Sequence, residues 1–587
     1  MNNKNYNYYL IEKKKNNWRE LINEKKNKGK NAILPPPNIT GDLHIGHALN
    51  SIILDFFIRS SYLIKNKKKI DFIPGIDHAG ISTQSKIESL DLKKLDNNIK
   101  KINYTSKIWY PDSKKNFCFQ WKKLGLLINT KKIFFTFDKR SQKIVKESFI
   151  KLYKEEFIYR GLKLVNWDPK IKSVISDSEI EERNILGNLY YLKYFLEDSK
   201  DYLLVATTRP ETIFADVSLF VNPNDQRYKK FINKKVFNPL NKKKIPILAD
   251  EKVKIEFGSG VLKCTPGHDF KDYELAKKHN LPIITCCNEK GLLNERANKW
   301  KNKNISYIRK ELVEYLLKKN ICEKIEEKRI NVNYSIRTNS MSEIILSKQW
   351  FLNLPLLIKK VNFEKNDFLE NIDIKPLNFK NELKKWKNNA KEWCISRQSW
   401  WGHKIPAWYQ KKSNKTHVGI KKPIKGDWLA DKDVLDTWFS SSLWPIITTY
   451  KNIKNNSFLY PTTLLITGYD IIFFWVLKMI IMGYFFKKEK PFKKIFIHGL
   501  IRDEKGKKMS KSLNNGILPN EIIKKHGCDS LRIFLLENNI WGSDLNYKEE
   551  KIKKNWKLCQ KIWNIFNFIK IKTNFKKITK KELFSNN

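Results

Sequence analysis

The chain has 587 residues, of which 41% are hydrophobic and 13% aromatic, which is ample for buried cores and predicts about four domains of roughly 150 residues each. Its formal net charge of +53 at pH 7 indicates a polyanionic partner such as nucleic acid. The lysines are scattered along the whole sequence, however, so compositional drift explains much of the excess as well.

The stretch PPPNITGDLHIGHALN at residues 35–50 follows a short apolar run that predicts a buried strand, and its prolines end any strand pairing. From Ile45 onward, apolar residues recur at helical spacing. His44 and His47 therefore share the first turn of a helix, where free N–H groups and the helix dipole attract anions. Gly46 lets a ligand approach the backbone closely. We interpret this turn as a phosphate site; the alternative is two ordinary surface histidines.

A second strand is predicted at Ile70–Ile73, and it ends in the turn PGIDHAG. Ligand groups in open α/β sheets lie at such carboxyl ends of strands. Asp77 is therefore a candidate partner for a cation, with an ordinary helix cap as the alternative. Strands followed by amphipathic helices over residues 30–165 predict a parallel α/β fold.

The pattern changes near residue 190, where β-rich segments begin and recur to about residue 265. This predicts a separate β-rich domain that ends near residue 330. Alternation of strands and helices resumes after Leu346, and from about residue 516 the pattern is nearly all helical and very basic. The predicted segments are 1–189, 190–330, 331–515 and 516–587.

The apolar stretch Leu464–Phe486 is long enough to span a bilayer. It contains Asp470 and Lys478, each of which costs about 2.5–3.5 kcal/mol near the centre of a membrane. We therefore predict a buried strand at Thr463–Thr467 and a buried helix from Ile471, with membrane insertion as the weaker alternative.

Downstream, KGKKMSKS at residues 505–512 forms a glycine-hinged loop that carries lysines and hydroxyl groups. Such a loop can close on a polyphosphate and neutralise developing charge. The alternative is a solvated basic loop.

Eight cysteines occur without any C-x-x-C pair, so neither a zinc ribbon nor a thioredoxin-type motif is indicated, and we expect no structural zinc. The stretch MNNKNYNYYLIEKKK at the N-terminus lacks the apolar core of a signal peptide. These features predict reduced thiols and a cytoplasmic protein.

The ordered pair LHIGH at 43–47 and KMSKS at 508–512, separated by an α/β chain with a β-rich insert, resembles the class I aminoacyl-tRNA synthetases. TTRPETIFAD and GHDFKDYE are similar to the editing insert of the valyl, isoleucyl and leucyl group. Three stretches resemble the valyl enzymes in particular: EWCISRQSWWGHKIPAWY, DVLDTWFSSSLWP and TGYDIIFFWVLKMI.

The resemblance implies a Rossmann-like parallel-sheet catalytic domain, split by the β-rich editing insert at 190–330 and followed by a short helical segment. Residues 542–569 are similar to the start of the helical anticodon-binding domain, and the sequence stops at Asn587. A C-terminally shortened member of the family is therefore expected.

The implied reaction is ATP-dependent activation of valine to valyl-adenylate and transfer to tRNA(Val), in a monomeric cytoplasmic enzyme with Mg²⁺ bound to the nucleotide. The positions that match the family's ATP-binding residues are His44, Gly46, His47, Lys508, Ser510 and Lys511. The positions that match its amino-acid-binding residues are Pro36, Asn38, Asp77, Trp438, Ile471 and Trp475. Asp77 is expected to bind the ammonium group of valine.

An apolar pocket rejects threonine poorly, and in the valyl enzymes it does so by a factor of only about 10². The resemblance therefore implies a second site that hydrolyses threonyl-tRNA by means of an oriented water. The matching positions are Thr207, Arg209, Phe257, Lys263, Thr265, Asp269 and Asp272. Asp269 and Asp272 also fit a helix cap with stabilising acids in the first turn.

Two alternative functions stay open at this stage. One is isoleucyl or leucyl specificity, which the WWGH and DTWFSS stretches match poorly. The other is a degenerate protein that binds or edits tRNA without activating an amino acid, which the short C-terminal segment favours. In either case we predict salt-dependent binding of tRNA through its phosphates.

Overall fold

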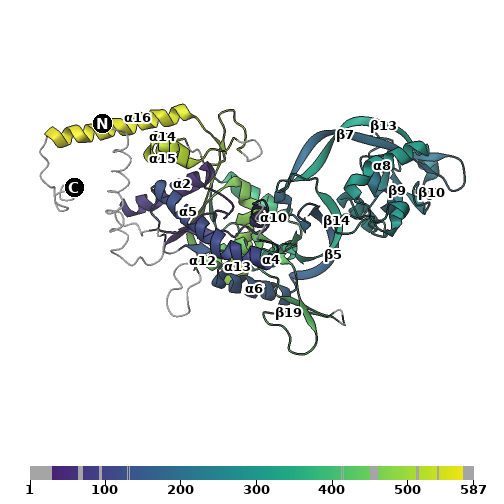
Figure 1. Cartoon of the computed structure of the whole chain (residues 1–587), viewed down its shortest axis with the longest axis horizontal. Coiled ribbons are helices and arrows are strands. Elements are labelled where there is room, and N and C mark those ends of the chain that lie inside the picture. Colours follow the sequence, from purple (N-terminus) through teal and green to yellow (C-terminus); the bar gives the residue numbers. More distant parts are fainter. Residues whose placement is uncertain are drawn as a thin grey trace.

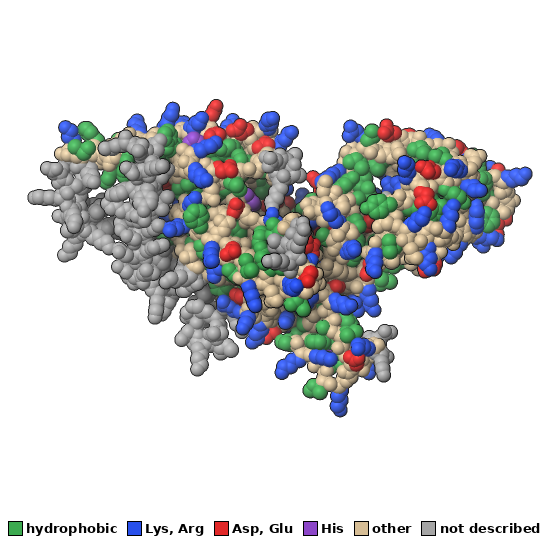
Figure 2. Space-filling model, in the orientation of Figure 1, with side chains coloured by type: hydrophobic (Ala, Val, Ile, Leu, Met, Phe, Trp, Pro, Cys, Tyr) green, Lys and Arg blue, Asp and Glu red, His purple; other side chains and the backbone are tan. Residues whose placement is uncertain are grey.

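A computed structural model describes most of the chain, and Figure 1 shows it as two bodies joined by long strands. Figure 2 shows Lys and Arg side chains spread over both bodies on the visible face rather than gathered in one stripe. The described residues are 30–63, 70–90, 95–128, 130, 133–411, 413, 415–449, 460–509, 515–538 and 541–572.

The larger body is built on a five-stranded sheet in the order β15-β23-β22-β1-β2. All its pairings are parallel. The strands are β1 (Asn31–Ile33), β2 (Asp71–Ile73), β15 (Asp373–Lys375), β22 (Thr462–Gly468) and β23 (Phe492–His498). From β1 the chain continues to β2 on one side of the sheet, and from β22 it continues to β23 on the other side. The strand order therefore reverses between β1 and β22. Open α/β sheets bind ligands at such a point. The predicted Rossmann-like parallel sheet is confirmed.

Helices cover this sheet because their apolar faces follow the helical period. In α2 (Ile45–Leu63), the side chains of Ala48, Leu49 and Ile52 are buried. The other helices of this body are α3 (Gly80–Glu88), α4 (Asn98–Tyr104), α5 (Tyr110–Lys123), α6 (Lys139–Lys154), α9 (Leu354–Lys365), α10 (Asn378–Asn388), α11 (Thr437–Ser442) and α12 (Trp444–Thr449).

The apolar stretch after β22 forms a π-helical turn at Ile472–Leu477 and then α13 (Lys478–Lys487). Within the described part of the chain, Tyr469–Lys487 is long and apolar enough to cross a membrane, and 67% of this window is buried inside the protein. That burial is typical of a core helix, as predicted.

Two antiparallel strand pairs lead from the larger body to the second one. First β5 (Ile158–Asp168) pairs with β14 (Glu343–Leu352). Farther out, β7 (Ile180–Phe195) pairs with β13 (Cys322–Ser335), and we call this pair the ribbon. The chain leaves along β5 and β7 and returns along β13 and β14 (Figure 1). The predicted segment bounds at 190 and 330 fall inside the two ribbon strands.

The second body, the insert, holds a four-stranded sheet in the order β10-β11-β9-β12, and its hydrophobic core extends into β5 and β14. Its strands and helices are β8 (Tyr202–Thr207), β9 (Ser218–Val221), β10 (Lys235–Phe237), β11 (Lys244–Ala249), β12 (Val261–Cys264), α7 (Phe270–Lys278) and α8 (Ile305–Lys318). The predicted β-rich character of this region is confirmed.

Short strands and three helices complete the larger body. The short strands are β3 (Gly75–Ile76), β4 (Phe134–Phe135), β6 (Ser173–Val174), β16 (Trp393–Cys394), β17 (Ser396–Arg397), β18 (Ala407–Gln410), β19 (Thr416–Val418), β20 (Trp428–Ala430), β21 (Val434–Leu435), β24 (Ile501–Arg502) and β25 (Leu545–Asn546). The helices α14 (Pro519–His526), α15 (Cys528–Glu537) and α16 (Glu549–Lys572) confirm the helical C-terminal segment.

Candidate active site

The two histidines of the LHIGH motif lie against each other at the start of α2, with ring centroids 3.8 Å apart. The His44 N–H donates to Nδ1 of His47 at 3.2 Å, and the Gly46 N–H donates to Nδ1 of His44 at 3.1 Å. A Cβ at Gly46 would lie 2.9 Å from Cε1 of His44, so only glycine leaves room for this ring. The motif is therefore a folded turn and not two independent surface residues.

These hydrogen bonds decide where the imidazole protons lie. Because each Nδ1 accepts an N–H, the neutral rings of His44 and His47 carry their protons on Nε2. Burial, and to a lesser extent the neighbouring His44, lower the pKa of His47 well below its usual value. Both rings therefore present Nε2–H donors at a helix N-terminus, which suits the binding of phosphate oxygens.

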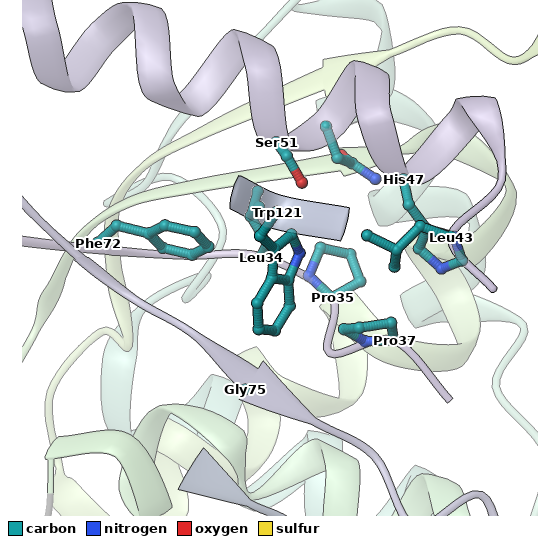
Figure 3. Close-up of a pocket in the computed structure, with 10 residues that line it drawn as sticks. Leu34, Pro35, Pro37, Leu43, His47, Ser51, Phe72, Gly75 and Trp121 are labelled. Carbon is teal, nitrogen blue, oxygen red and sulfur yellow. The ribbon is translucent and has the colours of Figure 1, made fainter. Parts of the chain in front are cut away.

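A cavity next to the histidines lies between α2 and the loop that follows β1. Figure 3 shows His47 on α2 above Pro35 and Pro37 of that loop. The remaining lining residues are Leu34, Leu43, Asn50, Ser51, Phe72, Gly75 and Trp121.

The KMSKS segment follows β23, on the other side of the point where the strand order reverses. Lys508 forms a β-bridge with Arg502, and Asp503 accepts the N–H of Lys507 at 2.7 Å. Burial raises the pKa of Asp470, which follows β22, and the charge of Lys508 opposes that rise. Lys508 therefore lies within electrostatic range of the carboxyl end of β22. Ser510 and Lys511 lie outside the described residues.

A histidine outside both motifs joins the two halves of this edge. His498 ends β23, and its Nε2 lies 2.6 Å from Oδ1 of Asn50 on α2. Burial lowers the pKa of His498 to about 4, so its ring is neutral. The contact holds the α2 helix, which carries His44 and His47, beside the strand that leads to Lys508.

A second pocket contains three of the six predicted amino-acid-binding residues, Asn38, Asp77 and Trp438. Asn38 and Asp77 are joined by backbone hydrogen bonds, with the Asp77 N–H donating to Pro37 O at 2.9 Å and the Ile39 N–H to Asp77 O at 3.2 Å. The loops after β1 and β3 are thus fixed side by side at the base of this pocket.

The carboxylate of Asp77 is buried and held from several sides. The Ala79 N–H donates to Oδ1 at 3.1 Å, Thr136 Oγ1 donates to Oδ1 at 2.9 Å, and Ser441 Oγ donates to Oδ2 at 2.9 Å. Burial alone would raise the pKa of Asp77, but bonding and charge from His78, with the other hydrogen bonds, lower it below its usual value. Asp77 is therefore ionised at neutral pH and oriented to bind a cationic group.

Helix α11 meets α3 very closely at this pocket. A Cβ added at Gly80, the first residue of α3, would lie 2.4 Å from Oγ1 of Thr437. Gly80 has φ +26°, a conformation that favours glycine. The lack of a side chain at this position lets the helix that follows Asp77 touch the helix that carries Ser441.

The other three predicted residues do not line this pocket. Pro36 lies between the two prolines of the first cavity. Trp475 is fully buried, and its Nε1 donates to Ser441 O at 3.0 Å, while Ile471 packs against the same hydrophobic core. Trp475 therefore supports the segment that orients Asp77.

Several pocket residues were not predicted from the sequence. Ser441 lies in the quoted DVLDTWFSSSLWP stretch, but the sequence gives no sign of which of its three serines points inward. The pocket also contains four charged side chains, Glu179, Arg337, Arg397 and Asp436.

The insert contains a buried cluster of polar groups that includes three predicted editing residues. Lys263 Nζ lies 3.0 Å from Asp216 Oδ1 and 2.9 Å from Thr212 Oγ1, and it also contacts Thr265 Oγ1. The Thr265 N–H donates to Asp272 Oδ2 at 2.7 Å. Asp216 and Thr212 belong to the TTRPETIFAD motif but were not singled out from it.

Asp272 is 7% exposed, and burial together with the nearby Asp269 raises its pKa to about 7. Its protonation state therefore changes in the physiological pH range. Asp269 caps α7 by accepting the N–H groups of Lys271 at 2.7 Å and of Asp272 at 3.1 Å. The cap considered for this pair is thus present at Asp269, whereas Asp272 faces the polar cluster.

The other predicted editing residues are Thr207, Arg209 and Phe257. Their contacts involve residues other than Asp272. The Arg209 guanidinium forms ion pairs with Glu211 and with Glu343 on β14, and the Arg209 N–H donates to Thr207 Oγ1 at 3.1 Å. Phe257 is 57% exposed, with Lys328 Nζ of the ribbon 5.4 Å from its ring centroid.

The described part of both sites holds no metal-binding cluster. In the described ranges, no group of three or more His, Cys, Asp or Glu side chains is placed to hold a metal ion.

Comparison with known proteins places this arrangement in a family. The family model "tRNA synthetases class I (I, L, M and V)" matches residues 8–424 and 420–548. The chain therefore belongs to the class I tRNA synthetases of this group.

Curated relatives include proteins named valine–tRNA ligase. The sequence is 46% identical to that of Malacoplasma penetrans over 97% of this chain, and 44% identical to that of Mycoplasma mycoides over 96%. It is 41% identical to that of Bacillus licheniformis over 94%. The chain spans 66%, 65% and 63% of the length of these relatives.

Among solved structures, a leucyl-tRNA synthetase of Agrobacterium radiobacter K84, in a ternary complex with tRNA and LeuAMS, has a similar fold. The TM-score is 0.52 at 16% identity, and the match covers 96% of this chain and 76% of that one. The likeness supports the fold of the two bodies.

Proposed function

We propose that this chain is a valine–tRNA ligase that activates valine with ATP, transfers it to tRNA(Val) and hydrolyses threonyl-tRNA. One observation carries the proposal: the ionised, buried Asp77 shares one edge of the parallel sheet with His44 and His47, in a chain 41–46% identical to valine–tRNA ligases. An anchor for an ammonium group beside donors for phosphate is what amino-acid activation requires.

Activation joins the carboxylate of valine to the α-phosphorus of ATP. Asp77 binds the valine ammonium group, so the carboxylate faces the nucleotide held at the start of α2. A carboxylate oxygen forms a bond to the α-phosphorus, the bond from that phosphorus to the bridging oxygen breaks, and pyrophosphate leaves. Nε2–H groups of His44 and His47 stabilise the phosphate oxygens, and Lys508 and Lys511 neutralise the leaving pyrophosphate.

The second step transfers the valyl group to RNA. A hydroxyl oxygen of the terminal tRNA ribose attacks the carbonyl carbon of valyl-adenylate, the bond to the phosphate oxygen breaks, and AMP leaves with the hydroxyl proton transferred to its phosphate. Asp77 keeps the ammonium group fixed during this step, so the carbonyl stays in place for the incoming hydroxyl.

Mg²⁺ bound to the nucleotide neutralises phosphate charge in such reactions. We place it with ATP, whose phosphate oxygens are ligands that Mg²⁺ prefers. The partners proposed here are valine and tRNA(Val), and the enzyme acts in the cytoplasm.

Editing is assigned to the polar cluster of the insert. Asp272, ionised above its pKa of about 7, binds the ammonium group of a mischarged threonyl residue. Lys263 and Thr265 lie next to it and offer polar groups to the ester and to an attacking water.

The test is amino-acid-dependent ATP–pyrophosphate exchange by the purified chain, with valine, isoleucine, leucine and threonine tried separately. We expect exchange to be strongest with valine and weaker with threonine. Strongest exchange with isoleucine or leucine would reassign the amino acid. No exchange from a folded chain that still binds tRNA would replace the proposal by a protein that binds or edits tRNA only.

A further inference from the structure

Part of the amino-acid pocket comes from the ribbon that carries the insert. Glu179 directly precedes β7 and Arg337 lies just beyond the end of β13, yet both line the same pocket as Asp77 and Trp438. The two ends of the ribbon therefore reach the site that the parallel sheet builds.

Glu179 and Arg337 are fixed to each other and to the base of the ribbon. Arg337 Nε donates to Glu179 Oε1 at 3.1 Å, and the Ile336 N–H donates to Glu179 O at 2.9 Å. The other carboxylate oxygen, Oε2, accepts the Ser176 N–H at 3.0 Å. Side chain and backbone thus join the start of β7 to the end of β13.

The pair is placed to act on charged groups inside the pocket. Glu179 is 8% exposed, whereas the Arg337 side chain is 32% exposed and lies at the rim. Burial alone would raise the pKa of Glu179, but the guanidinium groups of Arg337 and Arg397 lower it below its usual value. Glu179 is therefore a buried anion between a cation of the ribbon and a cation of the larger body.

Arg397 of β17 connects this part of the pocket to α11. Its NH2 lies 3.0 Å from Asp436 Oδ2, and Asp436 Oδ1 accepts the Trp438 N–H at 3.3 Å, which caps α11. The same short helix carries Ser441, which donates to Asp77. The electrostatic attraction between Glu179 and Arg397, the Arg397–Asp436 ion pair and the hydrogen bonds of α11 thus link the ribbon to Asp77.

We propose that Glu179 and Arg337 are positioning residues of the amino-acid pocket, which bind the base of the ribbon to α11 and so set the placement of Trp438 and Asp77. This inference rests on the proposed function, since it takes valine as the occupant of the pocket. Because coupling between two sites is reciprocal, occupancy of the pocket by valine also stabilises the base of the ribbon.

The first experiment measures valine-dependent pyrophosphate exchange by the full chain and its Glu179→Gln and Arg337→Gln variants. Substitutions within a coupled network change binding by about three- to thirty-fold. We expect KM for valine to rise by that factor in both variants, while kcat stays within about twofold. Arg337→Lys keeps the charge and should recover part of the loss.

Matched controls lie a short way farther along β7. Glu181 and Arg183 form an ion pair of 2.6 Å on this strand, and neither of them lines the pocket. Glu181→Gln and Arg183→Gln should leave KM for valine unchanged. Equal KM values in wild type, Glu179→Gln, Arg337→Gln and the controls would overturn the inference, as would a fall in kcat at constant KM.

A second measurement does not depend on turnover. Hydrogen exchange of the β7 and β13 amides near Ile180 and Ser335 is compared with and without a non-hydrolysable valyl-adenylate analogue, valyl-adenosine sulfamate. Protection in wild type and its loss in Arg337→Gln would support the coupling; equal hydrogen exchange in all samples would refute it.

If the wild-type chain shows no valine-dependent exchange of pyrophosphate, the proposed function itself fails, which separates the two outcomes. Thermal melting identifies a misfolded Glu179→Gln, in which case the partly exposed Arg337 decides the test.

Discussion

Replacing Asp272 by asparagine should stabilise the insert at neutral pH while it removes editing. Burial raises the pKa of Asp272 from 3.8 to about 7, so the folded protein resists ionisation of this group. The stability that the protonated form contributes is complete below pH 3.8 and is lost as pH rises toward 7. The amide that Asp272→Asn introduces can still accept the Thr265 N–H but never ionises.

The pKa difference sets the size of the effect. A difference of about 3, at about 1.36 kcal/mol per pKa unit, makes the cost of ionised Asp272 about 4 kcal/mol above pH 7. By about pH 5.5 roughly half of this cost is already present, because the unfolded carboxyl is ionised there. The stability advantage of Asp272→Asn should therefore grow by about 2 kcal/mol between about pH 5.5 and pH 8.

Two assays test this prediction. The first is urea unfolding of wild type and Asp272→Asn at both pH values, monitored by a signal that reports on the insert. The second is deacylation of threonyl-tRNA. Glu274→Gln is the control, since Glu274 lies on the same helix but outside the buried polar cluster. If the stability difference between wild type and Asp272→Asn is the same at both pH values, the raised pKa of the buried Asp272 carboxyl is refuted. Deacylation by Asp272→Asn at the wild-type rate would refute its part in editing.

Three further results are expected. Gly46→Ala should reduce pyrophosphate exchange at least tenfold, because the added Cβ meets the His44 ring. Gly41→Ala is the control, since a Cβ at Gly41 has no atom within 4 Å, and it should leave the rate unchanged. Equal rates in the two variants would contradict the packing argument. Ser441→Ala should raise KM for valine about tenfold, because it removes a hydrogen bond to the ionised Asp77. Ser442→Ala is the control, since the Ser442 hydroxyl donates to Phe439 O instead, and it should leave KM unchanged. The same KM in both variants would contradict the role of Ser441. Binding of tRNA, measured by fluorescence anisotropy, should weaken steeply with salt, and a nearly flat plot of log affinity against log salt would rule out phosphate contacts as its source.

Local patterns predicted the strand and the helix that place His44 and His47 together. An apolar run, three prolines and helical spacing from Ile45 lie within about 30 residues, so the β1–α2 unit needs no distant contact to be predicted. Chemistry that depends on the same few residues, such as the proton positions of His44 and His47, follows once the turn is known.

The amino-acid side depended on contacts that the sequence does not reveal. Ser441 and Asp77 are 364 positions apart, and Glu179 and Arg337 are 158 apart. A serine triplet, or a glutamate at the start of an exposed strand, shows no periodicity that marks it as part of a pocket. Such residues become candidates only when the fold brings their elements together.

The pairing of β1 with β22 has a consequence for synthesis on the ribosome. Thr463 of β22 donates its N–H to the Asn31 side chain of β1, across 432 positions of chain. At about 5–20 residues per second, the nascent β1 and β2 wait roughly 20–90 s before their central neighbour exists. The insert, whose return strand β13 ends at Ser335, is synthesised before then. The order of emergence therefore leaves an apolar parallel edge unpaired for most of translation, and makes this half of the sheet the part of the nascent chain most in need of a chaperone.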